Sequence, residues 1–334
     1  MNDRRKSQLI LFVATIFLTS VSPSLSLQQE TDSPAQQEDD VVRVTTSLVT
    51  IPVSVMDRNG RFVSGLEQNQ FHLFEDGIEQ HIAFFDGAEQ AFTVALMLDV
   101  SDSTKEKLDE IKNAARAFID ELKENDRVMV VVFDKNITVM CEPTSDRTLV
   151  NLAIDRARWG GGTSLYDAVE LMATKQLRRI RGRKAIVLFT DGVDTTSSGA
   201  TYEGTLRAAE ELDALIYSIQ YNTYDVETPP LPDGQPAAPV VTSTGEPLSV
   251  AYKRAGVYLQ SLSDKTAGRF YSATGLKYLR QIFSRIAAEL RQQYSLGYYP
   301  SNKSAAKRRR DLKVRVNLPG VALRYRRSYI YAAQ

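Results

Sequence analysis

The chain has 334 residues, of which 43% are hydrophobic and 25% are charged. This composition is that of a globular protein long enough for one α/β domain and a smaller partner, and it argues against a disordered or fibrous protein. The 41 Lys and Arg residues balance 41 Asp and Glu residues. Net charge therefore gives no reason to expect binding to nucleic acid or to an anionic membrane.

The first residues have the order of a signal peptide. A basic segment at residues 4–6 precedes the apolar run 9–18, and the small residues Ser24 and Ser26 follow. We predict a signal peptide over residues 1–26, cleavage after Ser26, and a secreted or periplasmic mature chain without a membrane span. The apolar run is short for a bilayer, which needs about 20 apolar residues; an uncleaved N-terminal anchor is the alternative.

Two segments follow the predicted signal peptide. Residues 27–40 are polar and lack apolar periodicity, which predicts a flexible leader. Residues 41–88 alternate apolar runs with an Asn-Gly pair at 59–60 and an Asp-Gly pair at 76–77. Because such pairs supply the positive φ of tight hairpins, this segment is expected to form a small β domain.

From residue 91 to 295 the pattern alternates between buried strands and amphipathic helices. Strands are expected at 93–98, 127–133, 184–189, 215–221 and 269–272, and helices at 105–123, 164–177, 202–212, 250–266 and 277–293. Parallel strands need long crossovers, so this alternation predicts an α/β fold with an open, doubly wound, mostly parallel sheet. The Pro-rich stretch 222–249 interrupts it as a surface insertion.

The last segment, residues 296–334, returns to strand patterns. We expect these strands to join the N-terminal β domain in a sandwich. The basic stretch 303–310 is expected to be a solvated hairpin tip, with contact to phosphate or anionic lipid as the alternative.

Three loops follow the ends of predicted strands or open a helix, and they offer only oxygen atoms. The first loop carries Asp99, Ser101 and Ser103, the second is rich in glycine and ends at Thr163, and the third carries Asp191 in a Thr-Asp-Gly sequence. Ligands of open α/β sheets bind at the carboxyl edge, where these loops converge. Hard oxygen ligands favour Mg²⁺, Mn²⁺ or Ca²⁺ over zinc or copper, and we take Mg²⁺ as the first choice.

The order Asp-x-Ser-x-Ser, Gly-Gly-Thr and Thr-Asp-Gly resembles the metal-ion-dependent adhesion site (MIDAS) of von Willebrand factor A domains, with every position filled. The resemblance implies that Ser101, Ser103 and Thr163 coordinate the ion directly, while Asp99 and Asp191 act largely through water. The whole arrangement also resembles an exported bacterial family related to these domains, which implies a location and an architecture but no substrate.

Each part of the motif also has an ordinary structural explanation. Ser103 with Glu106, and Ser164 with Asp167, have the spacing of helix caps, and the three glycines are compatible with simple flexibility. Metal binding is favoured because three separated motifs agree.

Four further residues have less specific expectations. Asp102 and Asp194 are expected to be solvated neighbours of the site, and Trp159 either lines the ligand groove or packs beneath the loop. Cys141 is the single cysteine, so it forms no disulfide within the chain and is expected to be a small packing residue.

These features predict a binding module that is not an enzyme. The ion would capture an Asp or Glu side chain of a protein partner, and both histidines, His72 and His81, lie outside the α/β region. A metal-dependent hydrolase is the first alternative, although no base is evident. A structural envelope protein with a non-functional metal site is the second.

Overall fold

The computed structural model describes residues 48–221, 241–242, 245–273, 278–302 and 309–331. The predicted signal peptide, the leader and most of the predicted Pro-rich insertion lie outside these ranges. Among the helices of the described residues, none is long and apolar enough to span a membrane.

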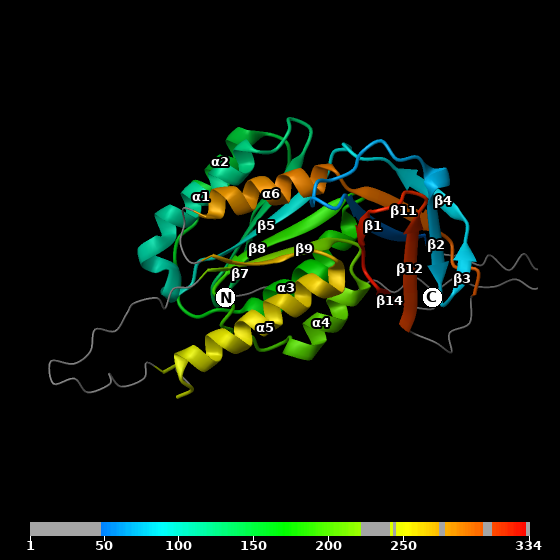
Figure 1. Cartoon of the computed structure of the whole chain (residues 1–334). Helices are drawn as coiled ribbons and strands as arrows, with labels where there is room; N and C mark the ends of the chain where they lie inside the picture. Colours follow the sequence, from blue (N-terminus) through cyan, green and yellow to red (C-terminus); the bar gives the residue numbers. More distant parts are fainter. Residues whose placement is uncertain (1–47, 222–240, 243–244, 274–277, 303–308, 332–334) are drawn as a thin grey trace, which may run out of the picture. The chain divides into compact units, whose positions relative to one another are not determined.

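A six-stranded sheet forms the centre of the α/β region, in the strand order β10-β9-β8-β5-β6-β7 (Figure 1). Five strands are parallel, and β7 runs antiparallel to β6. The strand bounds are Thr93–Asp99 (β5), Arg127–Phe133 (β6), Ile137–Thr144 (β7), Lys184–Thr190 (β8), Leu215–Tyr221 (β9) and Phe270–Ala273 (β10). This mostly parallel sheet confirms the predicted fold class. Its inner strands are continuous apolar runs, as expected of strands that are buried on both faces.

Six helices cover the two faces of this sheet. They are Leu108–Asp120 (α1), Arg147–Arg156 (α2), Leu165–Leu171 (α3), Tyr202–Glu211 (α4), Leu248–Thr266 (α5) and Leu279–Arg291 (α6). Apolar side chains of α1, α2 and α6 pack in the hydrophobic cluster on one face, and those of α3, α4 and α5 pack in the cluster on the other. Cys141 is half-buried and packs against the first cluster, as expected of a small packing residue.

The helices differ from the prediction in three details. A 3₁₀ segment, Asp102–Lys107, precedes α1, so the α-helix starts three residues later than predicted. The helix that begins with α3 continues as a π turn, Met172–Gln176, and a 3₁₀ turn. Helix α2 was not predicted at all; Asp146 begins it by accepting hydrogen bonds from the backbone N–H groups of Thr148 and Leu149.

The remaining strands form two four-stranded sheets, ordered β13-β1-β11-β4 and β14-β12-β2-β3. Their bounds are Val49–Met56 (β1), Phe71–Glu75 (β2), Ile78–Gln80 (β3), Ile82–Asp86 (β4), Tyr294–Tyr298 (β11), Arg309–Val316 (β12), Ala322–Arg324 (β13) and Ser328–Ile330 (β14). Strands from both sides of the α/β region therefore share each sheet, and their apolar side chains form one sandwich core. The predicted boundary at residues 295 and 296 falls inside β11.

The basic stretch at 303–310 is not a solvated hairpin tip at its carboxyl end. Residues 303–308 lie outside the described ranges, but Arg310 belongs to β12 and its side chain is fully buried. Its Nη1 lies 3.2 Å from Oε1 of Glu75, and the other oxygen of that carboxylate accepts hydrogen bonds from Tyr298 (2.6 Å) and Tyr329 (2.7 Å). The expectation of a solvated Arg310 was wrong, because a buried carboxylate requires a nearby cation.

A second buried carboxylate joins the sandwich to the α/β region. Glu289 of α6 is 1% exposed and forms ion pairs with Arg269, which precedes β10, and with Arg324 of β13. Nearby, the buried Arg326 donates to the carbonyl oxygens of Leu212 and Thr50. These contacts hold the terminal strands against the amino edge of the central sheet.

We expect Glu75→Gln to destabilise the chain by about 3–5 kcal/mol, because removal of one charge from a buried ion pair leaves the other without its counter-charge. Urea denaturation followed by circular dichroism measures the change. Lys313→Gln, which removes an exposed charge from the same strand β12, is the control and should have little effect. A loss below about 1 kcal/mol in Glu75→Gln, the size typical of exposed pairs, would contradict a central role for the buried pair.

Candidate metal centre

The predicted metal-binding residues lie at the carboxyl edge of the central sheet. Strand β5 ends at Asp99, and its neighbour β8 ends one residue before Asp191. The two strands pair in parallel, with Leu98 opposite Phe189, so both chain ends reach the same edge. The glycine-rich loop is held against them, because the Gly160 N–H donates to the carbonyl of Val100 at 2.8 Å.

Two glycines of this loop lie close against side chains of other segments. A Cβ atom on Gly160 would lie 1.7 Å from Oδ2 of Asp134, and one on Gly162 would lie 2.6 Å from Cγ2 of Thr196. Gly162 also has φ +75°, which disfavours other residues. These glycines shape the loop, so the alternative that they provide only flexibility is wrong.

A hydrogen-bonded cluster joins the first and third loops. Ser103 Oγ donates to Oδ2 of Asp191 at 2.7 Å, and the hydroxyls of Ser101 and Ser103 lie 3.2 Å apart. Asp99 lies behind them and is fully buried; its carboxylate accepts from the Ser101 N–H at 3.0 Å and from the Thr190 hydroxyl at 2.5 Å. The cluster leaves oxygen atoms of the two loops facing one space.

Thr163 brings the second loop to the same space. Its N–H donates to Thr195 Oγ1 at 2.8 Å, and its carbonyl accepts from the N–H groups of Thr195 and Thr196. Within the described part of the chain, its own hydroxyl makes no hydrogen bond. Thr163, Ser101, Ser103 and Asp191 all line one pocket of about 500 Å³. Four of the five predicted residues therefore meet in this pocket, and Asp99 supports them from behind.

Burial and a neighbouring negative charge set the ionisation of Asp99. Desolvation is the larger cause and the charge of Asp191 the second; together they raise the pKa of Asp99 to about 7, against the opposing hydrogen bonds from Ser101 and Thr190. Two carboxylates that repel one another beside neutral hydroxyls suit a divalent cation, which would stabilise both charged forms. Among the described residues, no three or more His, Cys, Asp or Glu side chains are placed so that they could hold a metal ion together, so a metal site here would need the hydroxyls as ligands.

The helix-cap explanation of the two serines is wrong. The Ser103 hydroxyl bonds Asp191, as described, and forms no cap. The Ser164 hydroxyl donates to the carbonyl of Lys135 and contacts Thr196 Oγ1. Asp167 instead accepts backbone N–H groups of residues 198–200, in the loop that follows β8.

Two residues near the site were missed by sequence reasoning. Tyr252 of α5 donates its hydroxyl to Oδ2 of Asp191 at 3.1 Å. Gln220 of β9 donates to the backbone carbonyls of both Asp191 and Tyr252, each at 3.1 Å. The Pro-rich stretch separates Tyr252 from β9 in sequence, so no local pattern indicated that it would reach the site.

The expectations for three residues near the site compare differently with the structure. Asp102 is exposed and lines the pocket, as a solvated neighbour does. Asp194 is not simply solvated, because it accepts from the Tyr166 N–H and the Ser197 hydroxyl, and burial raises its pKa. Trp159 neither lines the pocket nor packs beneath the loop; it is 48% exposed, with Lys105 Nζ 4.0 Å from its ring centre.

The doubly wound sheet and the three oxygen-bearing loops at its carboxyl edge place this region in the class of α/β domains that bind ligands at that edge. Residues 94–193 match the family model of the von Willebrand factor type A domain. This part of the chain is therefore a von Willebrand factor type A domain.

Individual relatives are distant. An uncharacterized protein from Borreliella burgdorferi is 25% identical over 203 residues, which cover 54% of this chain and 53% of that protein; the chain thus spans about half the length of this relative. A von Willebrand factor type A structure from Catenulispora acidiphila aligns at 12% identity and a TM-score of 0.47, covering 86% of this chain and 75% of that one. Proximal thread matrix protein 1 of the mussel byssus, described with a zinc-occupied MIDAS motif, aligns at 15% identity and a TM-score of 0.46, covering 64% and 49%.

In the absence of divalent ions, we expect Asp99 to make the chain less stable as pH rises from about 4 to 7. The folded-state pKa of about 7 exceeds the ordinary value of 3.8, so in this interval the unfolded chain binds fewer protons than the folded chain, and each pH unit removes up to about 1.4 kcal/mol.

Urea denaturation in EDTA at several pH values tests this expectation. Asp99→Asn removes the titrating group, so the difference in stability between wild type and variant should change steadily across the interval. A difference that is independent of pH would show that the pKa of Asp99 is not raised.

Proposed function

We propose that this chain is a metal-dependent protein-interaction module that acts outside the cytoplasm and captures an acidic side chain of a protein partner. The observation that carries the proposal is the convergence of Ser101, Ser103, Thr163 and Asp191 on one pocket, with Asp99 buried behind it. The predicted signal peptide supports the location.

The donor set suits Mg²⁺, with Mn²⁺ or Ca²⁺ as alternatives. Ser101, Ser103 and Thr163 would supply neutral hydroxyl ligands, and Asp99 and Asp191 would orient the surrounding groups. Neutral ligands leave much of the ion's charge uncompensated, so the bound ion would attract a carboxylate from a partner. Asp99 supports this arrangement because its carboxylate is turned to Ser101 and Thr190 and does not line the pocket.

The walls of the pocket indicate what surrounds the partner's carboxylate. Val193, Val241 and Leu248 are apolar, and Val241 is 51% exposed. The lining also includes hydroxyl-bearing residues, among them Thr195 and Thr196. A partner segment with an acidic residue next to an aliphatic one would fit this lining, because the aliphatic side chain could cover the exposed Val241.

A hydrolase is the weaker proposal. A metal-activated water needs a base to accept its proton, and the chain's two histidines lie in the sandwich region. His72 is held there by Glu79 at 2.8 Å and by Asn317 at 2.9 Å. No feature of the described pocket favours hydrolysis over binding.

Asp191→Ala should abolish binding of Mg²⁺, because Asp191 both lines the pocket and holds Ser103. Isothermal titration calorimetry with Mg²⁺, Mn²⁺, Ca²⁺ and Zn²⁺ measures the loss. Asp109→Ala, which removes an exposed carboxylate from α1, is the matched control. Partner proteins should be retained on immobilised wild-type chain in Mg²⁺, released by EDTA, and not retained by Asp191→Ala. A folded Asp191→Ala chain that binds Mg²⁺ and partners like wild type would refute the proposal.

Tyr252→Phe should weaken Mg²⁺ binding by about tenfold, because groups that hold a metal ligand in place typically contribute this much or more. The change removes only the hydroxyl that bonds Asp191 and keeps the ring. Calorimetry is again the measurement, and Tyr299→Phe, at a half-exposed tyrosine of the sandwich region, is the control. Equal Mg²⁺ affinity in Tyr252→Phe and wild type would mean that Asp191 is held without Tyr252.

A further inference from the structure

Trp159 and Lys105 form an exposed pair beside the candidate metal centre. Trp159 is the only tryptophan of the chain and is 48% exposed, and the Nζ atom of Lys105 lies 4.0 Å from the centre of its ring. The face of an indole ring attracts a cation in this position. The pair belongs neither to the lining of the metal pocket nor to the hydrophobic clusters of the central sheet, so neither metal binding nor core packing accounts for it.

The backbone places this pair next to the metal-binding loops. Lys105 lies two residues after Ser103, in the 3₁₀ segment that precedes α1. Trp159 comes directly before Gly160, whose N–H donates to the carbonyl of Val100. Both residues therefore flank the metal pocket on the side where α1 begins and α2 has ended.

The charge of Lys105 has no acidic partner in the part of the chain that the structure describes. Its ammonium group forms no ion pair and no hydrogen bond there; its contact is the ring of Trp159. The neighbouring Asp102 lines the metal pocket, where the ion would offset its charge. Segments 102–107 and 156–158 together carry four basic and two acidic side chains. This side of the pocket is therefore net basic and complements an acidic partner.

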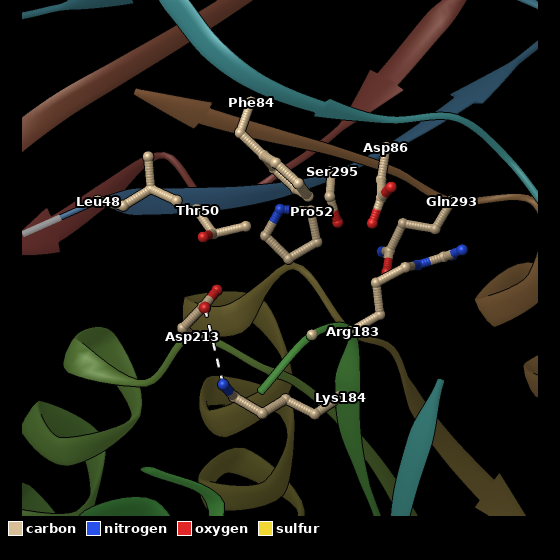
Figure 2. A pocket seen from close by; sticks show the side chains of 11 residues that line it. Leu48, Thr50, Pro52, Phe84, Asp86, Arg183, Lys184, Asp213, Gln293 and Ser295 are labelled. Carbon is tan, nitrogen blue, oxygen red and sulfur yellow. Dashed lines mark ion pairs between the residues drawn. The ribbon is translucent and has the colours of Figure 1, made fainter. Parts of the chain in front are cut away.

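A smaller pocket, of about 150 Å³, shows the opposite arrangement (Figure 2). It lies between the amino edge of the central sheet and the sandwich. Lys184 lies 3.7 Å from Asp213 there, and Asp86 is the strongest acidic influence on the buried Arg183. The basic and acidic side chains of this pocket thus balance one another within the protein, as Lys105 does not.

An exposed indole that holds a lysine has the properties of an anchor in a protein interface. Tryptophan is enriched among the residues that contribute most to binding energy. A lysine side chain that is already held in place loses less conformational entropy when it binds a partner than a free one does. The pair is thus prepared for a contact that the metal ion alone does not provide.

We propose that the partner of the metal centre presents two acidic residues, separated by one position, and that the second contacts Lys105 and Trp159. This inference rests on the proposed function. One carboxylate completes the coordination of the ion, and the other pairs with the ammonium group of Lys105 and covers part of the indole. In an extended segment this spacing is the shortest that places two side chains on one face, about 7 Å apart.

Capped peptides test the proposal on the full chain in saturating Mg²⁺. Gly-Glu-Val-Glu-Gly is compared with two versions in which either Glu is replaced by Gln, and calorimetry measures each affinity. We expect the diacidic peptide to bind about fivefold more tightly than the others, near the upper limit for an exposed ion pair. It should also shift the fluorescence of Trp159, the chain's only tryptophan, to shorter wavelength, because the indole loses water.

Lys105→Gln should abolish the preference for the diacidic peptide, apart from the statistical advantage of two carboxylates. The affinities for Mg²⁺ and for the single-acid peptides should stay unchanged. Trp159→Leu should also reduce the preference, because Lys105 is then no longer held. Lys175→Gln, at an exposed lysine of the π turn Met172–Gln176, is the matched control and should behave like wild type.

A Lys105→Gln chain that keeps the wild-type preference would overturn the proposal. Binding of the diacidic peptide without a change in Trp159 fluorescence would do so as well. If Mg²⁺ binds and the diacidic peptide does not bind at millimolar concentration, this inference fails while the metal site stands. If Mg²⁺ itself does not bind, which calorimetry shows before any peptide is added, the proposed function fails and this inference fails with it.

Discussion

The parallel pairing of β5 with β8 is the constraint on which the metal centre depends. The register places Leu98 beside Phe189, so the residues that follow, Asp99 and Thr190, are fixed beside one another with a hydrogen bond of 2.5 Å between their side chains. Both strands are buried on both faces, and neither can slide without exposing apolar side chains. The position of the carboxylates is thus a consequence of the hydrophobic core.

This constraint has an electrostatic consequence at the same edge. Asp99 cannot leave its buried position to reach water, and the charge of Asp191 acts on it from the neighbouring loop. The fold therefore holds two acidic groups close together in a site from which neither can relax. Hydrogen bonds to Asp191 from Ser103, Tyr252 and the Val193 N–H fix its orientation as well.

The central sheet, and the placement of the predicted metal-binding residues at one edge of it, could be foreseen because both depend on local patterns. Buried strands are continuous apolar runs, and the loops that carry Asp99, Thr163 and Asp191 directly follow strands or open a helix. Residues that depend on distant contacts could not be foreseen. Tyr252 contacts Asp191 across 61 residues of sequence, and the buried Arg310 pairs with Glu75 across 235 residues.

Helix α2 shows a second reason why a structural feature could not be predicted from the sequence. Leu149 and Leu152 are 50% and 41% exposed, so its apolar residues do not follow the one-sided pattern that identifies a packed helix. Asp194 shows a third, because a carboxylate beside a turn has the same sequence appearance whether water or backbone N–H groups surround it. Its contacts come from Tyr166 and Ser197, of which only the second is close in sequence.

Strand β8 connects two chemically different pockets. It begins at Lys184, beside the pocket that contains Asp86, and ends at Thr190, beside the candidate metal centre. At about 3.3 Å per residue, the two lie roughly 20 Å apart along one rigid strand. One pocket offers neutral hydroxyls around two carboxylates and suits a compact ion. The other contains both cationic and acidic side chains, and these balance one another within the protein: Lys184 pairs with Asp213, and Asp86 is the strongest acidic influence on Arg183.

The two ends of the α/β region lie side by side, since the Glu89 N–H donates to the carbonyl of Arg291 at 2.6 Å. This contact bears on the order in which the chain folds. Glu75 and Arg310 are 235 residues apart in sequence, and closing so long a loop in an unfolded chain is slow and entropically costly. Once the α/β region has folded, its two ends lie close together, and the adjoining strands β4 and β11 are therefore close enough to pair. A folded α/β region therefore lowers the entropic cost of bringing the two halves of the sandwich core together.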